Sequence, residues 1–408
     1  MQILTGVYLF FILATLYIYS FFLLILFKNR KDLFSYDLLD KDFPSVTLLI
    51  PAYNEEDNIA GTIESVLACK YPRDKLEVIV IDDGSKDKTS EIAKRYPVKL
   101  LQKSNSGKAD SLNQGINLAK GEFIGVVDAD SYPEKNALLK VMSCFKDPEV
   151  AAVTSAVRVK NPNSFLGGLQ AVEYTIIAWA RKLLEYVNSV YVTPGPLSVY
   201  RSEVLRKLEG FDNKVLTEDI ELAWRILKNK HYKIKMCLAA RIFTIAPVKF
   251  KAWWRQRLRW DIGGLQTLNK HKNVFFRHNY GMVGLFVAPF FASTVFLSLL
   301  GFSIFIYLLS KRVLNAFFFT SNSLATDSLS MQIKSIYLSP SIFTFFGVLL
   351  FITYFVYLII GLKMMDRTNV KIDKKLNIPL YLLFYLPLYP LVFIHSIYLI
   401  LTNKIIKW

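Results

Sequence analysis

Four long stretches without Asp, Glu, Lys or Arg limit what this chain can fold into more than any other feature of the sequence. They are Met1 to Phe27, Tyr280 to Ser310, Ser335 to Leu362 and Leu376 to Asn403. Each exceeds the roughly 20 apolar residues needed to cross the hydrocarbon core of a bilayer. The sequence therefore predicts four transmembrane helices, near residues 1–27, 281–310, 338–362 and 377–402. Three prolines in the last stretch favour a bent or re-entrant segment there.

The first stretch has two interpretations, a cleaved signal peptide or a retained anchor. Its apolar run exceeds the roughly 7 to 15 residues of a signal peptide, and no small-residue cleavage site follows, which favours an anchor. Lys28, Arg30 and Lys31 come next, and such positive residues favour the cytoplasmic side. The basic loop at 363–375 gives the same orientation. The sequence thus predicts an integral protein of the cell membrane whose segment up to Tyr280 is cytoplasmic.

The formal net charge of +17 raises the question of nucleic-acid binding. Much of the positive excess borders the apolar stretches, where it sets topology and attracts anionic membrane lipids. The sequence contains no nucleic-acid-binding motif, so membrane lipid is the favoured partner and nucleic acid is not. Cys69, Cys144 and Cys237 have no paired spacing, which favours reduced structural thiols over a disulfide framework or a zinc site.

Between the first and second apolar stretches, strand-like runs alternate with helix-like segments. The runs are VTLLI (46–50), EVIVI (77–81), VKLLQ (98–102), EFIGVV (122–127) and VAAVTSAV (150–157). This alternation predicts a parallel sheet covered on both faces, a Rossmann-like α/β domain. The expected organisation is a transmembrane helix at 1–27, an α/β domain at 43–246, interfacial helices at 247–279 and a membrane region at 280–408.

Acidic motifs follow three of these runs, where a parallel sheet binds its ligands. PAYNE (Pro51 to Glu55) ends the first, DDGSKD (Asp82 to Asp87) ends the second, and DAD (Asp128 to Asp130) ends the fourth. An acidic loop is usually solvated surface. Two carboxylates directly after a buried strand, however, also make an oxygen site suited to Mg²⁺ or Mn²⁺ carrying a phosphate.

The segment TEDIELAW (217–224) has two compatible interpretations. Thr217 is placed to cap a helix whose first turn holds Glu218 and Asp219, a common structural arrangement. Alternatively, Asp219 lies at the ligand edge of the sheet and accepts a proton from a substrate hydroxyl. The residues alone favour neither interpretation over the other.

QRLRW (256–260) stands just before the membrane region. On a helix, Gln256, Arg259 and Trp260 share one face, whereas Arg257 is expected to point elsewhere. A stripe of apolar residues at spacings of three and four is typical of an interfacial amphipathic helix. We therefore expect a membrane-anchored helix that turns the Gln256, Arg259 and Trp260 face toward the site.

In this order, PAYNE, DDGS, DAD, TED and QRLRW resemble the motifs of the membrane-bound family 2 glycosyltransferases, which include cellulose, chitin, hyaluronan and poly-N-acetylglucosamine synthases. The resemblance covers Phe43 to about Leu268. GKADSLNQGI, TEDIELAWRI, QRLRWDIGG and YLPLYPLVF look most similar to the poly-N-acetylglucosamine synthases. The resemblance implies a GT-A catalytic domain followed by amphipathic and transmembrane helices. The gating loop of cellulose synthases has no clear counterpart here.

The resemblance also implies a role for each motif. The nucleotide would contact Arg259 of QRLRW and eight residues of four other motifs. These are Pro51, Ala52, Tyr53, Glu55, Asp82, Asp83, Lys108 and Asp128. Asp128 and Asp130 would hold Mg²⁺ or Mn²⁺ with the diphosphate. Asp219 would be the general base, with Glu218 beside it. The acceptor would meet Gly195 and Pro196 of the loop TPGPLSVYR (193–201), together with Gln256 and Trp260.

These roles describe inverting transfer from a UDP-sugar, in which a metal and an arginine stabilise the charge that grows on the leaving diphosphate. The leading expectation is a processive synthase that extends a β-linked glycan, with N-acetylglucosamine as the expected sugar unit. The alternative is transfer of one sugar to a lipid acceptor such as a polyprenyl phosphate or a ceramide-like lipid. A non-catalytic receptor for nucleotide sugars is disfavoured, because every acidic motif is retained. Four spans make a small channel, so a partner subunit or a dimer is a further expectation.

Overall fold

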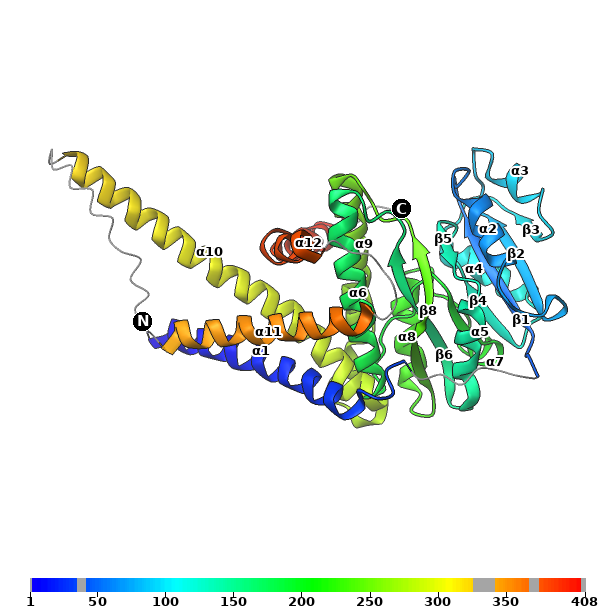
Figure 1. The fold of residues 1–408 in the computed structure, drawn as a ribbon, viewed down its shortest axis with the longest axis horizontal. Helices are drawn as coiled ribbons and strands as arrows, with labels where there is room; N and C mark the ends of the chain where they lie inside the picture. Colours follow the sequence, from blue (N-terminus) through cyan, green and yellow to red (C-terminus); the bar gives the residue numbers. More distant parts are fainter. Residues whose placement is uncertain (1, 35–41, 326–341, 367–373, 405–408) are drawn as a thin grey trace.

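The fold, obtained as a computed structural model, is described for residues 2–34, 42–325, 342–366 and 374–404. A domain built on one sheet lies at one end, and long helices extend from it toward the other (Figure 1). Helices α6 (Phe165–Glu185) and α9 (Phe250–Lys270) stand between these two parts. The structure therefore consists of a sheet domain and a set of long helices.

The sheet has eight strands in the order β3-β2-β1-β4-β7-β6-β8-β5. In chain order these are β1 (Val46–Ala52), β2 (Leu76–Asp82), β3 (Lys99–Gln102), β4 (Phe123–Val126), β5 (Ser131–Pro133), β6 (Val150–Val159), β7 (Ser198–Arg201) and β8 (Lys233–Thr244). Strands β1 to β4 pair in parallel, with Ala52 beside Asp82, so the PAYNE, DDGS and DAD loops meet at one edge.

The expectation of a wholly parallel sheet is wrong. Strand β7 runs antiparallel to both β4 and β6, and β5 runs antiparallel to β8, although β6 and β8 are parallel. The antiparallel β7 enters the sheet between the two parallel parts. As a result, the loop before it, which carries Gly195 and Pro196, arrives at the same edge as the DAD loop.

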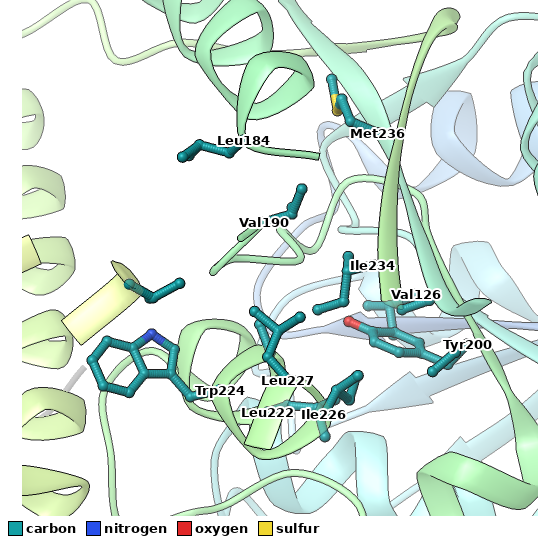
Figure 2. Packing of buried hydrophobic residues seen from close by; sticks show 14 of the residues in the cluster. Val126, Leu184, Val190, Tyr200, Leu222, Trp224, Ile226, Leu227, Ile234 and Met236 are labelled. Atoms are coloured by element: carbon teal, nitrogen blue, oxygen red, sulfur yellow. The ribbon is translucent and has the colours of Figure 1, made fainter. Parts of the chain in front are cut away.

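Helices cover both faces of the sheet. The remaining elements before α9 are α2 (Ile59–Leu67), η1 (Arg73–Lys75), α3 (Thr89–Ala93), α4 (Lys108–Leu118), α5 (Ala137–Met142), η2 (Ser143–Lys146), α7 (Ser202–Lys207) and α8 (Glu218–Lys228). One buried cluster joins the sheet to α2 and α5, and another joins it to α4, α6 and α8. Figure 2 shows the second cluster, where Leu227 of α8 lies near Ile234 of β8.

Three helices in the described part of the chain are long and apolar enough to cross a membrane, at Thr5–Asn29, Val283–Asn315 and Leu376–Leu401. A fourth apolar helical stretch, Val348–Met364, is shorter, and the start of the expected third span lies outside the described residues. The helices are α1 (Gln2–Asn29), η3 (Lys272–Val274), η4 (His278–Tyr280), the π-helix η5 (Val283–Val287), α10 (Ala288–Ala325), α11 (Ile342–Asp366), α12 (Lys374–Leu380), the π-helix η6 (Tyr381–Tyr385) and α13 (Leu388–Leu401).

The prolines shape the last apolar segment as expected. Pro379 lies inside α12, a π-helical turn follows, and Pro387 precedes α13. The apolar face of α9 packs against this segment: Leu258 and Ile262 are buried in a cluster that includes Tyr381, Tyr385 and Val392. The predicted apolar stripe of α9 therefore contacts the C-terminal helices.

Candidate active site

Asp83, at the end of β2, fixes the loop that leads to Lys108. Its Oδ1 accepts a hydrogen bond from the Ser106 N–H (2.9 Å) and its Oδ2 one from the Gly107 N–H (2.8 Å). Lys103 forms an ion pair with the same carboxylate. Gly107 has φ of +95°, which glycine adopts without strain. These contacts place Lys108 at the first position of α4.

Lys108 joins the DAD motif to the TED motif. Its Nζ lies 2.7 Å from Asp128 Oδ1 and 3.3 Å from Glu218 Oε1. Burial by itself would lower the pKa of Lys108, but the charges of Asp128 and Glu218 outweigh it and raise the pKa. The lysine therefore stays charged and neutralises part of a carboxylate-rich site.

Asp130 is the second carboxylate of the DAD motif, and like Asp128 it is partly buried. Burial raises its pKa to about 6, with a further contribution from the charge of Asp128. Ser131 Oγ (3.2 Å) and Thr244 Oγ1 (3.3 Å) donate hydrogen bonds to Asp130 Oδ1. A partly buried carboxylate beside a second one is an electrostatic environment that a bound cation would relieve.

Asp219 lies in the first turn of α8, facing the same cluster of charges. Burial raises its pKa to about 6, and Glu218 raises it further, whereas Lys108 and Arg259 act in the opposite direction. Its Oδ1 accepts a hydrogen bond from the Ile220 N–H at 3.0 Å. A carboxylate with this pKa is suited to accept a proton near neutral pH.

The expected cap by Thr217 is only partly present. Thr217 occupies the N-cap position of α8, but its side chain makes no capping hydrogen bond. Its Oγ1 is buried without a partner, against α9. A Cβ at Gly263 would stand 2.2 Å from this oxygen, so α9 approaches α8 too closely for any larger residue there.

The PAYNE loop lies next to the acidic cluster. The pKa of Glu55 is raised by burial, and the charges of Asp130 and Asp128 add to this effect. The Asn58 side chain donates a 2.8 Å hydrogen bond to Glu55 Oε2, while Tyr53 is 44% exposed.

Three other predicted residues contribute mainly through the backbone or the loop geometry. Pro51 and Ala52 belong to β1, so they shape the strand end. Asp82 is buried and accepts a 2.9 Å hydrogen bond from the Ser85 N–H. Its carboxylate thus holds the turn that follows β2.

The acceptor-loop residues are placed against the acidic motif. A Cβ on Gly195 would stand 2.3 Å from Asp128 Oδ1, so only glycine leaves this carboxylate in position. The Pro196 carbonyl accepts a 3.1 Å hydrogen bond from Ser155 Oγ. This loop therefore forms a wall of the site with its backbone.

The expected helical face of QRLRW needs correction. Arg259 does face the site, because its charge acts on both Lys108 and Asp219. Arg257, however, does not point away from Gln256 and Trp260: it donates to Gln256 Oε1, and its guanidinium carbon lies 4.1 Å from the centre of the Trp260 ring. Long side chains at neighbouring positions bend toward each other, which Cα spacing does not show.

Arg181 and Glu173 of α6 are charged residues that the motifs did not identify. Burial lowers the pKa of Arg181, and the charge of Asp219 partly offsets this, so Arg181 adds another cation near the proposed base. Glu173 forms a buried ion pair with Arg257. The signal available in the sequence was the presence of charged residues within the long, largely apolar segment 165–185.

No cluster of three or more His, Cys, Asp or Glu side chains suited to a metal occurs among the described residues. Asp128 and Asp130 are the two acidic residues of the DAD motif. The charges of both raise the pKa of Glu55, and the charge of Asp128 also raises the pKa of Asp130. A metal at this position would therefore need further oxygen ligands from a phosphate or from water, as Mg²⁺ commonly has.

Comparison with known proteins connects this geometry to a family. The model of the "Glycosyltransferase like family 2" matches residues 44–263. The chain is 32% identical over 249 residues to poly-beta-1,6-N-acetyl-D-glucosamine synthase of Staphylococcus aureus strain MSSA476, covering 59% of this chain and 58% of that protein. It is also 32% identical over 230 residues to the synthase of the same name from Staphylococcus epidermidis, covering 55% of each. The aligned part thus spans somewhat over half the length of these curated relatives.

Among solved structures, the fold is similar to that of mannosyltransferase PcManGT from Pyrobaculum calidifontis in complex with GDP-Man and Mn2+. The TM-score is 0.54 at 22% identity, covering 74% of this chain and 91% of that one. This similarity supports the GT-A type of fold on which the charged cluster is built.

Proposed function

Because the chain belongs to the glycosyltransferase-like family 2, we propose that it is an inverting membrane enzyme that extends a β-linked polysaccharide from a UDP-sugar. The names of its relatives favour N-acetylglucosamine as the unit. The observation that carries the proposal is the charged cluster in which Lys108 joins Asp128 to Glu218, with Asp219 and Arg259 beside it.

In the proposed reaction, Asp219 accepts the proton of an acceptor hydroxyl. The hydroxyl oxygen attacks the anomeric carbon, and the bond from that carbon to the UDP oxygen breaks on the opposite side. The leaving diphosphate takes the bonding electron pair, and its new charge is stabilised by Lys108 and Arg259. Because transfer is a single displacement, the configuration at the anomeric carbon inverts.

A divalent cation, Mg²⁺ or Mn²⁺, completes the proposed site. Asp130 and Asp128 are the residues that would hold it, and the raised pKa of Asp130 fits a carboxylate awaiting a counter-charge. When bound, the cation supplies Lewis-acid stabilisation of the leaving diphosphate. Lys108 keeps its own contact with Asp128 and holds that carboxylate in place.

The remaining motifs are assigned to donor and acceptor. Tyr53, Glu55, Asp82 and Asp83, with the strand end at Pro51 and Ala52, are proposed to surround the base and ribose of the nucleotide. Gly195 and Pro196 form the wall facing the acceptor, and Gln256 and Trp260 contribute to the acceptor end. An aromatic ring there can stack on a sugar face without requiring one hydroxyl pattern.

The chain is proposed to act in the cell membrane with its sheet domain in the cytoplasm. The described helices provide three spans of clear length. We propose that a partner subunit or a second copy of the chain contributes further helices if the product crosses the bilayer.

Incubation of the purified protein with a panel of radiolabelled UDP-sugars, followed by sizing of the products, tests this proposal. We expect long product from UDP-N-acetylglucosamine while most acceptors remain unextended. Asp219→Asn should reduce transfer by about 10² to 10⁴-fold while UDP binding persists, and Trp260→Ala should shorten the product. A single sugar on an extractable lipid, with no longer species, would replace polymerisation with transfer to a lipid acceptor.

A further inference from the structure

A buried ion pair lies where the sheet domain meets the C-terminal helices. Arg257 of α9 is completely buried, Glu173 of α6 is 3% exposed, and the two side chains form a salt bridge. Burial by itself would lower the pKa of Arg257, but the charge of Glu173 outweighs it and raises the pKa. Arg257 is therefore a charged group that is completely buried.

Two tyrosines of the last apolar segment make further polar contacts with this pair. The Tyr385 hydroxyl donates to Glu173 Oε2 at 2.6 Å and accepts from Arg257 Nη2 at 3.0 Å. It also accepts a 2.6 Å hydrogen bond from Trp253 Nε1. Arg257 Nε donates to the Tyr389 hydroxyl at 3.0 Å. The arginine is thus oriented by groups from α6, η6 and α13.

The same guanidinium also contacts the residues proposed to meet the acceptor. It lies 4.1 Å from the centre of the Trp260 ring, and it donates to Gln256 Oε1. The ring of Tyr174 is 6.4 Å from that of Trp260. A cation over the face of an indole ring is an attractive contact with a defined orientation, so Arg257 restricts how Trp260 can turn.

An ion pair of this kind is seldom explained by stability. Well-packed apolar side chains often replace a buried pair without loss, because desolvation of the charges offsets their attraction. What the pair supplies here is orientation, since the planar guanidinium has several donors in fixed directions. Its nitrogens donate to the carboxylate, the two tyrosine hydroxyls and the Gln256 amide oxygen, and the cation also lies against the Trp260 ring.

We propose that Arg257 is a positioning residue that sets the orientation of Trp260 and Gln256, with Glu173 and Tyr385 as its anchors. Through it, the last membrane segment determines how the acceptor end of the site is arranged. This inference rests on the proposed function, because it assigns Trp260 to the acceptor. Arg257 itself touches neither substrate, and its effect is expected on acceptor use and not on donor binding.

The test uses Tyr385→Phe, which removes one hydroxyl and keeps the ring, and Arg257→Lys, which keeps the charge and removes the fork. Tyr398→Phe, at a 52% exposed tyrosine of α13, is the matched control. Tyr385→Phe should raise the KM for the acceptor by about fivefold and shorten the product. The KM for the UDP-sugar should stay within about twofold, and Tyr398→Phe should resemble the wild type.

A double-mutant cycle with Trp260→Ala separates positioning from a general structural effect. If Arg257 acts through the indole ring, Tyr385→Phe should cause little further loss once the ring is absent. Equal losses with and without the ring, or a parallel rise in donor KM, would overturn the inference. Thermal unfolding of each variant checks that the fold persists. If Arg257→Lys fails to fold, Tyr385→Phe alone tests the positioning role.

The wild type distinguishes this inference from the proposed function. If it adds one sugar only, polymerisation is contradicted, yet the cycle still reports on positioning through the acceptor KM. If it makes long product and the cycle is additive, the proposed function stands and the positioning role fails.

Discussion

Among single residues, Lys108 is the charge around which the site is arranged. It contacts Asp128 and Glu218 directly, while Asp130 and Asp219 are partly buried with a raised pKa of about 6. Lys108 therefore balances the charge of Asp128 and Glu218, whereas Asp130 and Asp219 remain available for other partners. In the proposed reaction those partners are a metal for Asp130 and a substrate proton for Asp219.

The raised pKa of Asp219 predicts how activity depends on pH. A general base works only when deprotonated, so kcat/KM should be constant well above pH 6 and fall about tenfold per pH unit below it. Glu218 raises this pKa, whereas Lys108, Arg259 and Arg181 are the cations that oppose it. Glu218→Gln should consequently move the acidic limb to lower pH, as measured by initial rates across pH 4.5–8, a range of about 1.5 to 2 units around the pKa.

Asp130 titrates in the same range, and metal concentration separates the two groups. Protonation of Asp130 competes with a cation, so an acidic limb caused by Asp130 should shift when Mn²⁺ is raised to saturation. A limb caused by Asp219 should stay where it is. A limb that moves fully with the metal would contradict the assignment of Asp219 as its source.

Removal of the metal should abolish transfer. Excess EDTA should stop turnover and Mg²⁺ or Mn²⁺ should restore it, because the growing charge on the diphosphate would otherwise lack a Lewis acid. Asp130→Ala should lower the rate at fixed metal on the order of a hundredfold. Asp147→Ala, at a surface carboxylate that pairs with Lys233, is the control. Full turnover in EDTA would refute metal dependence.

Sequence patterns identified the acidic residues well and the basic ones less well. Lys108, Asp128, Asp219 and Arg259 were expected together, and the structure places their charges within reach of one another. Arg257 was expected to point away from Gln256 and Trp260, and instead it is buried in contact with both. Motif order reports which strand ends meet, but the path of a long side chain depends on partners such as Tyr385, which are distant in sequence.

Among the helices, α8 and α9 matter most, because their close approach sets the position of the TED motif. The contact is made where Gly263 of α9 faces Thr217 at the start of α8. A second contact lies further along, where the buried Glu221 carboxylate of α8 contacts Lys270 at the end of α9 and His271 directly after it. Within α8, Glu221 also accepts a 2.6 Å hydrogen bond from Arg225. Asp219 stands between these two contacts, so its position depends on the spacing of the helices.

Gly263→Ala should therefore impair catalysis through that spacing. The added Cβ would lie 2.2 Å from Thr217 Oγ1, which forces the helices apart at a cost of about 1–3 kcal/mol. Thermal unfolding should show the loss, and kcat should fall more than donor affinity. The same substitution at Gly6, where nothing lies within 4 Å of the added atom, should be neutral. Unchanged kcat in Gly263→Ala would mean that Asp219 does not depend on α9.

The strands show where sequence patterns succeed and where they fail. The five expected runs all form strands. Four of them contain a continuous buried apolar segment, whereas β3 is only partly buried and has exposed ends. Strand β7 was missed: it has four residues directly after a proline-containing loop, and its pairing with β4 and β6 is long-range. Strand β8 was also missed, since charged residues interrupt its apolar pattern. The three-residue β5 was missed as well, and these three omissions hid the antiparallel pairings of the sheet.

In the whole molecule, the sheet domain and the long apolar helices lie at opposite ends (Figure 1). Helices α1, α10 and α11 extend away from the sheet domain, and the chain's N-terminus lies far from the sheet (Figure 1). The basic residues Lys28, Arg30 and Lys31 stand at the end of α1 that is nearest the domain. This arrangement agrees with the proposed orientation, in which the sheet domain faces the cytoplasm.

Site-specific labelling tests that orientation. In a chain whose native cysteines are replaced by serine, Arg312→Cys at the distant part of α10 should react with a membrane-impermeant maleimide in intact cells. Lys120→Cys in the sheet domain should react only after lysis. Both positions are exposed, so access and not burial decides the result. Labelling of Lys120→Cys in intact cells would invert the proposed topology.

The buried contacts of Arg257 also impose an order on biogenesis. Tyr385 follows Arg257 by 128 residues, and a ribosome adds on the order of 5–20 residues per second. For about 6 to 25 s, then, the emerging α9 has its Glu173 partner but not the hydroxyls that orient the arginine. On the proposed assignments, the acceptor end of the site would be ordered only once the last apolar segment is in place, so we expect a chain without that segment to bind the donor without an ordered acceptor site.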